Sequence, residues 1–453
     1  RVSLNLTGLP PTASEIQAFM NDQSSDAYQQ LITRLLNSPR YGERWARFWL
    51  DLAGYSDSEG KRNADTVRPY AYRWRDYVIQ SFNDDKPFNQ FLVEQIAGDE
   101  LVDYGDPSQV TQQTKEMLTA TGFMRMAPDG TSANPVNRFP DRIEVISDQI
   151  DILSRGLMGL TLKCAQCHTH KYDPIPQRDY YRFVALFRGA YDEYAWMTPQ
   201  PFNNQWRFAE QRRLDPATTD EIAQRTSHNE SISKAIKQLE QRIEDVKAEQ
   251  AAAKKSQTTD EARKEQRDFS AELKELNDKK AQLNTEKQTP EYIRALFDRG
   301  HPSPAFLYRR GDDTQPIAIV NPGIPSVLEL ESAPFSIEAP QHSTPKTGRR
   351  LALANWLTHK DHPLTARVIV NRIWKQNFGE GIVKSIDNFG IQGTPPTHPE
   401  LLDWLAVEFV ENNWSVKHIQ RLIVSSRAYQ QSSELTEELL TKDPDNSLLS
   451  RMP

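Results

Sequence analysis

The only two cysteines of the chain, Cys164 and Cys167, are separated by two residues and followed directly by His168. Two randomly placed cysteines would show this spacing, with a histidine after the second, in roughly one of ten thousand arrangements. The pattern is typical of covalent c-type haem attachment, in which two thiols bond the vinyl groups on one edge of a porphyrin. The adjacent histidine then ligates the iron from the same side. The spacing therefore predicts haem attached at Cys164 and Cys167, with His168 as the proximal iron ligand.

Two other chemistries use the same residue types. A C-x-x-C disulfide of redox type normally opens a helix after a strand, whereas residues 150–162, upstream of the motif, have a helical apolar pattern. A structural zinc ion needs four ligands, and Cys164, Cys167, His168 and His170 would have to supply them within a very short stretch. We favour haem, and the disulfide and the metal site are the alternatives.

Composition limits the remaining classes of function. The net charge is −7 and the isoelectric point is near 5.8, which argue against nucleic acid or an anionic membrane as the main partner. No apolar run approaches the roughly 20 residues that a membrane-spanning helix needs. The chain begins at Arg1 without a signal peptide and ends abruptly at Pro453. We expect it to be the ordered or processed part of a longer polypeptide, with a truncated C-terminal domain.

Apolar periodicity predicts a mainly α protein with few short strands. In the N-terminal part, Thr12 or Ser14 should cap a helix that has Glu15 in its first turn. The next helices are expected at 28–35, 41–52, 72–82, 88–101, 114–126, 142–162 and 177–187. The aromatic face formed by Trp45, Phe48 and Trp49 is interpreted as core packing, with a haem-facing stack as the alternative.

An acidic, irregular segment lies between residues 55 and 69. It contains Asp57, Glu59 and Asp65 among Gly60 and Asn63. Carboxylates in a loop are the ligands that calcium prefers, although the regular spacing of a dedicated calcium loop is missing. Calcium is therefore a weak second cofactor prediction.

Several longer strings carry a family resemblance. In the N-terminal part they are Leu6–Thr12, Tyr41–Ala46, Ala97–Leu101 and Cys164–Ile175 with Asp179–Tyr181 behind it. In the C-terminal part they are Arg349–Ala352, Asn371–Trp374 and Gly393–Leu405. The first set resembles the planctomycete cytochrome C domain family, and the second resembles the planctomycete-specific domain that usually follows it. Both are domains of unknown function, so the resemblance implies a haem protein without naming its activity.

A nearly all-polar segment without proline or glycine separates the two sets of strings. Ile232, Ile236, Leu239, Ile243 and Val246 form a heptad seam, and after a polar break at 254–260 the seam resumes at Phe269, Leu273, Leu276 and Leu283. This pattern predicts a protruding antiparallel coiled-coil hairpin over about 227–287, with arms of about 25 residues. Its exposed surface is a solvated spacer or a contact for a protein partner.

The expected organisation therefore has four parts. Residues 1–204 form the helical domain with the C-x-x-C-H, and residues 205–290 form the polar segment with the hairpin. Residues 291–347 form a Pro/Gly-rich connector laid over the surface, with short strands at 305–308 and 317–320. Residues 348–453 form a C-terminal helical domain, with helices expected near 351–357, 364–378, 399–410 and 416–429.

The distal iron position has three weak candidates. His170 is too close to His168 along the chain to contact the opposite face of the same haem. Met124 and Met126 precede the loop that leads to the motif helix, and His398 lies within one of the family strings. A methionine ligand is typical of an electron carrier, and an open site would allow small-ligand chemistry. For His398, a local capping role at a helix start is the alternative.

Together these patterns predict an exported, extracytoplasmic c-type haem protein that transfers electrons or performs haem redox chemistry. The redox partner is not specified by the sequence. A structural or interaction protein of the cell envelope, contacting its partner through residues 227–287, is a second hypothesis. A hydrolase using the carboxylates of residues 55–100 is a third, although no nucleophile–base pair stands out by its spacing.

Overall fold

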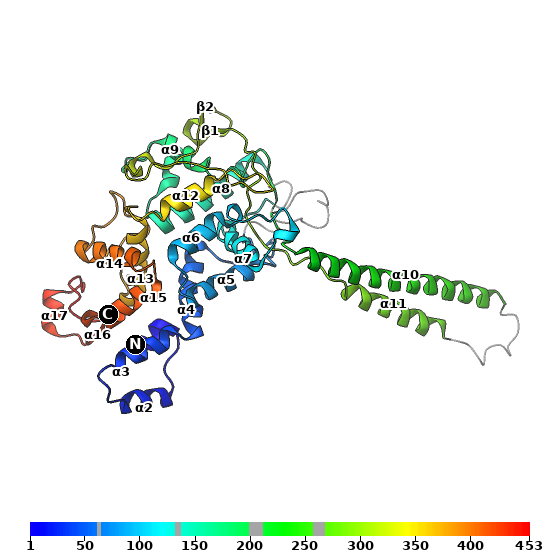
Figure 1. Ribbon diagram of the computed structural model, residues 1–453, viewed down its shortest axis with the longest axis horizontal. Helices are drawn as coiled ribbons and strands as arrows, with labels where there is room; N and C mark the ends of the chain where they lie inside the picture. The colour runs from blue at the N-terminus through cyan, green and yellow to red at the C-terminus, as the bar shows by residue number, and fades with distance from the viewer. Residues whose placement is uncertain (61–64, 132–136, 199–211, 257–267) are drawn as a thin grey trace. The chain divides into compact units, whose positions relative to one another are not determined.

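The structure is a computed structural model that describes the whole chain except residues 61–64, 132–136, 199–211 and 257–267. It confirms a mainly α fold, with one two-stranded antiparallel sheet among the described residues (Figure 1). The chain divides into two compact units. Unit 1 comprises residues 1–105, 112–214 and 293–453, and unit 2 comprises residues 106–111 and 215–292.

The N-terminal half of unit 1 is a set of short helices. They are α1 (Val2–Thr7), α2 (Ala13–Asn21), α3 (Ala27–Leu36), α4 (Pro39–Ala53), α5 (Ala71–Asn83), α6 (Phe88–Ala97), α7 (Gln112–Ala120), α8 (Phe139–Leu153) and α9 (Gln177–Val184). The predicted start of α2 is confirmed, because the Thr12 side chain accepts a bond from the Glu15 backbone while the Glu15 carboxylate accepts one from the Thr12 backbone. Ser38 caps α4, which has Pro39 in its first turn, where a proline costs no hydrogen bond.

The core of this half is aromatic. Trp49 of α4 packs against Phe88 and Phe91 of α6 and against Phe123. Its indole N–H donates to the Oε1 atom of Gln95, which also accepts from Trp74, so the polar edges of both rings are satisfied inside the core. The core interpretation of α4 is confirmed for Trp45 and Trp49, which are buried.

The C-terminal part of unit 1 is again helical. Its helices are α12 (Arg349–Leu357), α13 (Thr365–Phe378), α14 (Pro399–Glu411), α15 (Val416–Ser425), α16 (Arg427–Gln430) and α17 (Glu437–Lys442). Helix α13 is buried along most of its length and packs against α14 and α15. The helix expected over 416–429 is shorter in the structure. It ends at Ser425, because Ser426 adopts an extended backbone between α15 and α16.

The segment between the two helical parts differs from the expected surface connector. Its strands β1 (Ala305–Tyr308) and β2 (Pro316–Val320) pair antiparallel, as the apolar runs predict. However, Ile293, Ala295 and Leu296 are buried, and Ile293 pairs with Leu214 through two backbone hydrogen bonds. A Pro- and Gly-rich composition predicted irregular backbone correctly but did not predict that residues 293–298 are largely buried.

Unit 2 contains two long helices, α10 (Thr219–Ser256) and α11 (Phe269–Thr285). They lie side by side and antiparallel (Figure 1), with Arg242 bonded to Glu272 and Lys280 bonded to Glu240. Helix α10 is longer than expected because it begins at Thr219, where Thr218 and Glu221 form reciprocal capping bonds. The predicted polar break at 254–260 falls largely outside the described residues.

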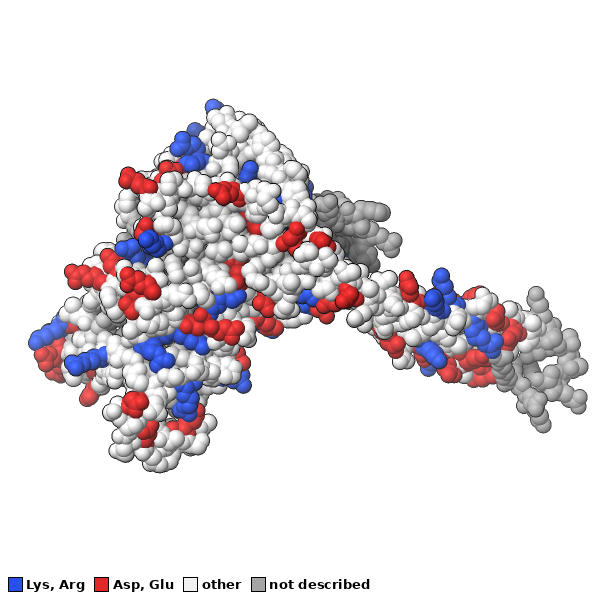
Figure 2. Space-filling view, viewed as in Figure 1, with Lys and Arg blue, Asp and Glu red and all other residues white. Residues whose placement is uncertain are grey.

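Charged side chains of both signs are distributed over the visible surfaces of both units (Figure 2). In the described part of the chain, no helix is both long enough and apolar enough to cross a membrane.

Candidate functional site

The helix that precedes the C-x-x-C-H ends earlier than the sequence predicts. The expected helix over 142–162 is α8, which passes into a π-helical turn at Ser154–Met158 and stops at Gly159. Gly159 has φ +61°, a left-handed conformation that L-residues with side chains rarely adopt. A Cβ atom there would also lie 2.7 Å from the ring of Phe389. The helix therefore ends at a glycine, and a separate turn holds the motif.

That turn is the 3₁₀ helix η5 (Leu162–Gln166), which continues into Cys167. In a 3₁₀ helix, side chains three positions apart lie on the same side. Leu162 and Ala165 are buried on one side, and Cys164 and Cys167 are exposed on the other. Both thiols are unpaired. The geometry therefore presents two free thiols on one exposed face.

His168 follows directly and is also exposed. Its Nδ1 atom lies 2.6 Å from the carbonyl oxygen of Thr169. Because a carbonyl only accepts, Nδ1 must carry the proton, which leaves the lone pair on Nε2. A histidine that ligates a metal commonly has this tautomer, with the other nitrogen bonded to a carbonyl. In the neutral ring, His168 therefore has the tautomer in which Nε2 is free to ligate iron.

His170 has a different role. It is buried, and its Nδ1 atom accepts bonds from the backbone N–H groups of Tyr172 and Asp173, at 3.3 and 2.9 Å. Its Nε2–H must then donate to the hydroxyl of Thr161 at 2.9 Å. Both nitrogens are occupied, so His170 fixes the loop after the motif and does not serve as a fourth metal ligand.

The rest of the motif string also stabilises the fold. The buried Asp173 carboxylate accepts a 2.7 Å bond from the backbone N–H of Ile391 in the C-terminal part of unit 1. The buried Asp179 carboxylate accepts from the backbone and hydroxyl of Ser326, at 2.7 and 2.6 Å. These two residues connect the motif region to segments far away in the sequence.

A turn from the β-hairpin lies beside the motif. In the turn Arg309–Gly311, Arg310 and Gly311 have φ +54° and +77°. A Cβ on Gly311 would lie 3.0 Å from the Sγ atom of Cys167. Arg309 and Arg310 are exposed. This turn was not predicted from the sequence, because its only local signal is a pair of arginines before a glycine.

The candidates for the distal ligand lie in different environments. Met124 and Met126 are fully buried in the core around the 3₁₀ turn Thr121–Arg125. His398 is partly buried at the start of α14, where its Nδ1 atom bonds the hydroxyl of Thr397 and its side chain makes no capping bond. Their predicted role as ligands stays a prediction.

The acidic residues considered for calcium or hydrolysis already have hydrogen-bond or ion-pair partners in the fold. The Glu59 carboxylate is buried between Arg68, at 2.6 Å, and Arg294, at 2.7 Å. Burial acts to raise the pKa of Glu59, but the two guanidinium groups outweigh it and lower that pKa to about 2. Asp57 accepts from the Tyr55 hydroxyl, and Asp65 accepts from the backbone of Gly60. Among the described residues, no group of three or more His, Cys, Asp or Glu side chains could hold a metal ion.

Asp99 and Glu100 form a second buried cluster with Arg350. The Arg350 guanidinium lies 2.7 Å from Asp99 and 3.4 Å from Glu100, and all three side chains are fully buried. Burial, together with the charges of Asp99 and Asp298, raises the pKa of Glu100 to about 8 despite Arg350. This cluster joins two of the family strings, Ala97–Leu101 and Arg349–Ala352, in one structural contact.

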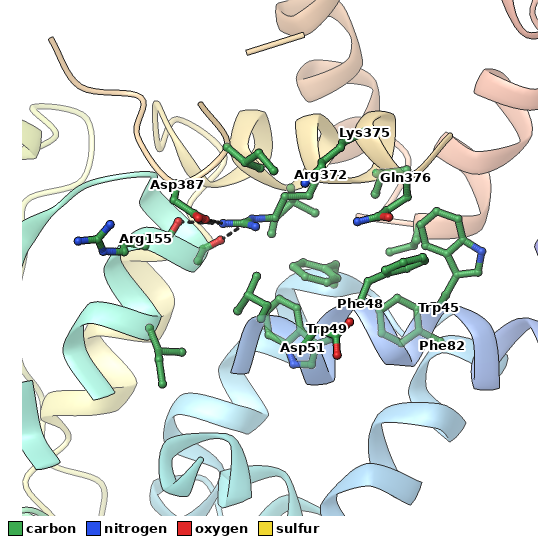
Figure 3. Close-up of a pocket in the computed structure, with 18 of the residues that line it drawn as sticks. Trp45, Phe48, Trp49, Asp51, Phe82, Arg155, Arg372, Lys375, Gln376 and Asp387 are labelled. Atoms are coloured by element: carbon green, nitrogen blue, oxygen red, sulfur yellow. Dashed lines mark hydrogen bonds and ion pairs between the residues drawn. The ribbon is translucent and has the colours of Figure 1, made fainter. Parts of the chain in front are cut away.

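Unit 1 also contains a pocket of about 500 Å³, shown in Figure 3. One wall is aromatic and comes from α4, α5 and α6, and the opposite wall is part of α13. This pocket was not predicted from the sequence. The available signal was the placement of Arg372, Lys375 and Gln376 at helical spacing on a helix that is otherwise buried.

Comparison with known protein families agrees with the resemblance. Residues 1–192 match the family model PSCyt2, described as a protein of unknown function (DUF1549), and residues 349–453 match PSD1, described as a protein of unknown function (DUF1553). No curated protein and no solved structure matches the chain. The chain therefore carries a planctomycete cytochrome C domain of the PSCyt2 family followed by a planctomycete-specific domain of the PSD1 family.

Proposed function

We propose that this protein is an extracytoplasmic c-type haem protein that uses its haem for electron transfer or redox chemistry. The observation that carries the proposal is the exposed face of η5, where Cys164 and Cys167 are eclipsed and unpaired and His168 follows. In the attachment step, each thiol adds across one vinyl group, so that a C–S bond forms and the thiol proton goes to the neighbouring carbon. The addition needs no oxidant. The haem supplies a one-electron iron centre once it is bound.

Two further observations support this assignment. The tautomer of His168 leaves Nε2 available for iron on the exposed side of the turn. The turn that carries the exposed Arg309 and Arg310 lies beside Cys167, so positive charge borders the attachment face. A zinc site is disfavoured because His170, the residue needed as a fourth ligand, has both ring nitrogens occupied.

The test is the mass of the denatured protein after expression in a host that has a cytochrome c maturation system. We expect the mass to increase by one haem, because thioether bonds survive denaturation. The variant Cys164→Ala/Cys167→Ala should show the unmodified mass. A wild-type chain that stays unmodified in this host, while a known c-type cytochrome expressed beside it is modified, would contradict the proposal.

For unit 2 we propose an antiparallel coiled coil formed by α10 and α11. The buried side chains of α10 include Ile232, Ile236, Ile243 and Val246, which belong to its heptad seam. In α11 the seam residues are partly buried, whereas most other positions are exposed. The charged outer surface of this pair (Figure 2) suits a solvated spacer or a protein contact, which keeps the cell-envelope interaction protein as the alternative function.

A further inference from the structure

The pocket of Figure 3 has two chemically different walls. The rings of Trp45, Phe48 and Trp49 from α4, with Phe82 and Phe88, form one wall. Helix α13 forms the other wall. The polar side chains that α13 places in the pocket lining are Arg372, Lys375 and Gln376. The volume of about 500 Å³ lies within the range of sites that bind small molecules. The pocket also lies where the two family domains meet, and such positions are common for ligand sites.

Most of the charges around the pocket are already paired. Arg155 bonds Asp151 at 2.7 Å, and Arg372 bonds Asp387 at 2.7 Å. Arg372 is also held by the backbone carbonyl groups of Arg155 and Gly156, at 3.1 and 3.2 Å. Each of these arginines is therefore paired with one carboxylate, so this end of the pocket has no net charge.

Two polar side chains on α13 differ from this pattern. Lys375 and Gln376 are partly buried, and no hydrogen bond or ion pair to another described residue is formed by either side chain. Asp51, across the pocket, is largely exposed and lies 3.7 Å from Arg47, so solvent screens its charge. The pocket therefore offers an aromatic wall and, facing it, one cation and one amide that have no partner among the described residues.

We propose that this pocket binds a small organic anion that combines an aromatic ring with a carboxylate. The ring would stack on the aromatic wall of α4, since aromatic groups bury large areas and favour offset contacts with each other. The carboxylate would accept bonds from Lys375 and Gln376, because a charge-assisted bond in a partly buried site is stronger than a neutral one. This inference is independent of the haem proposal, since none of the lining residues belongs to the C-x-x-C-H turn.

The experiment is isothermal titration calorimetry of the full chain with indole-3-acetate and with its uncharged amide, indole-3-acetamide. We expect the acid to bind about tenfold more tightly, because only the acid forms the charged bond to Lys375. In Lys375→Met, the acid should lose this advantage while the affinity for the amide is unchanged. The amide thereby reports that the variant still has an intact pocket.

The matched control is Lys360→Met, which removes an exposed lysine of the C-terminal domain that does not line the pocket. It should leave the affinity for both compounds unchanged. Equal affinity of the wild type for acid and amide would overturn the proposal, as would the absence of binding by both at millimolar concentration. Tighter binding of a neutral sugar such as glucose than of either indole compound would also overturn it.

Discussion

The residues of the C-x-x-C-H turn and of the Asp99–Arg350 cluster both belong to strings by which the chain resembles its families. The two groups differ in burial, because the cluster is buried and the turn is exposed. In the cluster, the Arg350 guanidinium lies 2.7 Å from the Asp99 carboxylate and 3.4 Å from the Glu100 carboxyl group, and all three side chains are fully buried. In the turn, two thiols and one imidazole are exposed, and the thiols are unpaired. The cluster stabilises the joint between two domains, whereas the turn leaves its reactive groups available.

The same difference in burial separates the residues of one motif into exposed reactive positions and buried structural positions. Within the single string from Cys164 to Asp173, the first residues are available for chemistry, while His170 and Asp173 are committed to the loop and to the C-terminal part of unit 1. A string that looks uniform in sequence therefore contains functional and structural positions side by side. Stability measurements can separate them, because only the structural positions should be costly to replace.

The largest effect is expected for Arg350→Met. This change leaves the buried carboxyl groups of Asp99 and Glu100 without the guanidinium that lies between them. Removing one partner of a buried ion pair typically costs about 3–5 kcal/mol, because the remaining charge is uncompensated. Calorimetric unfolding should show a large decrease in the melting temperature of unit 1.

A surface pair from the same C-terminal domain provides the control. Arg367 lies 2.6 Å from Asp403, and both side chains are substantially exposed. Replacing Arg367 by Met should cost at most about 1 kcal/mol, because solvent already screens that pair. Equal melting temperatures for the two variants would show that the buried cluster does not stabilise the joint.

A smaller effect, and one that depends on pH, is expected at Glu59. Its pKa in the folded protein is about 2, below its ordinary value of 4.5, so the folded state favours the ionised carboxylate. The corresponding stability is present above pH 4.5 and is lost as the pH falls toward 2. The shift corresponds to about 3 kcal/mol. Melting temperatures of the wild type should fall over this range more steeply than those of Glu59→Gln, and parallel curves would contradict the assignment.

The sequence predicted local features better than distant contacts. The capping box of Thr12 and Glu15, the strands expected at 305–308 and 317–320 and the aromatic face of α4 follow from neighbouring residues. The partner of Asp99 does not, because Arg350 is 251 positions away and no local periodicity relates the two. The spacing of Cys164 and Cys167 predicted a haem site but not the 3₁₀ turn that holds them, because nothing in the spacing indicates that α8 and its π turn end at Gly159.

The smallest effect on stability is expected for Cys164→Ser/Cys167→Ser in the haem-free chain. Both thiols are exposed and bonded to no other residue, so an isosteric hydroxyl removes no buried contact. The change in the free energy of unfolding should stay within about 0.5 kcal/mol, as for ordinary surface substitutions. The matched variant within the same string is Asp173→Asn, which alters the buried acceptor of the Ile391 N–H and should destabilise unit 1 measurably. If the double serine variant were the less stable of the two, the thiols would be part of the fold, and the distinction between available and committed residues would fail.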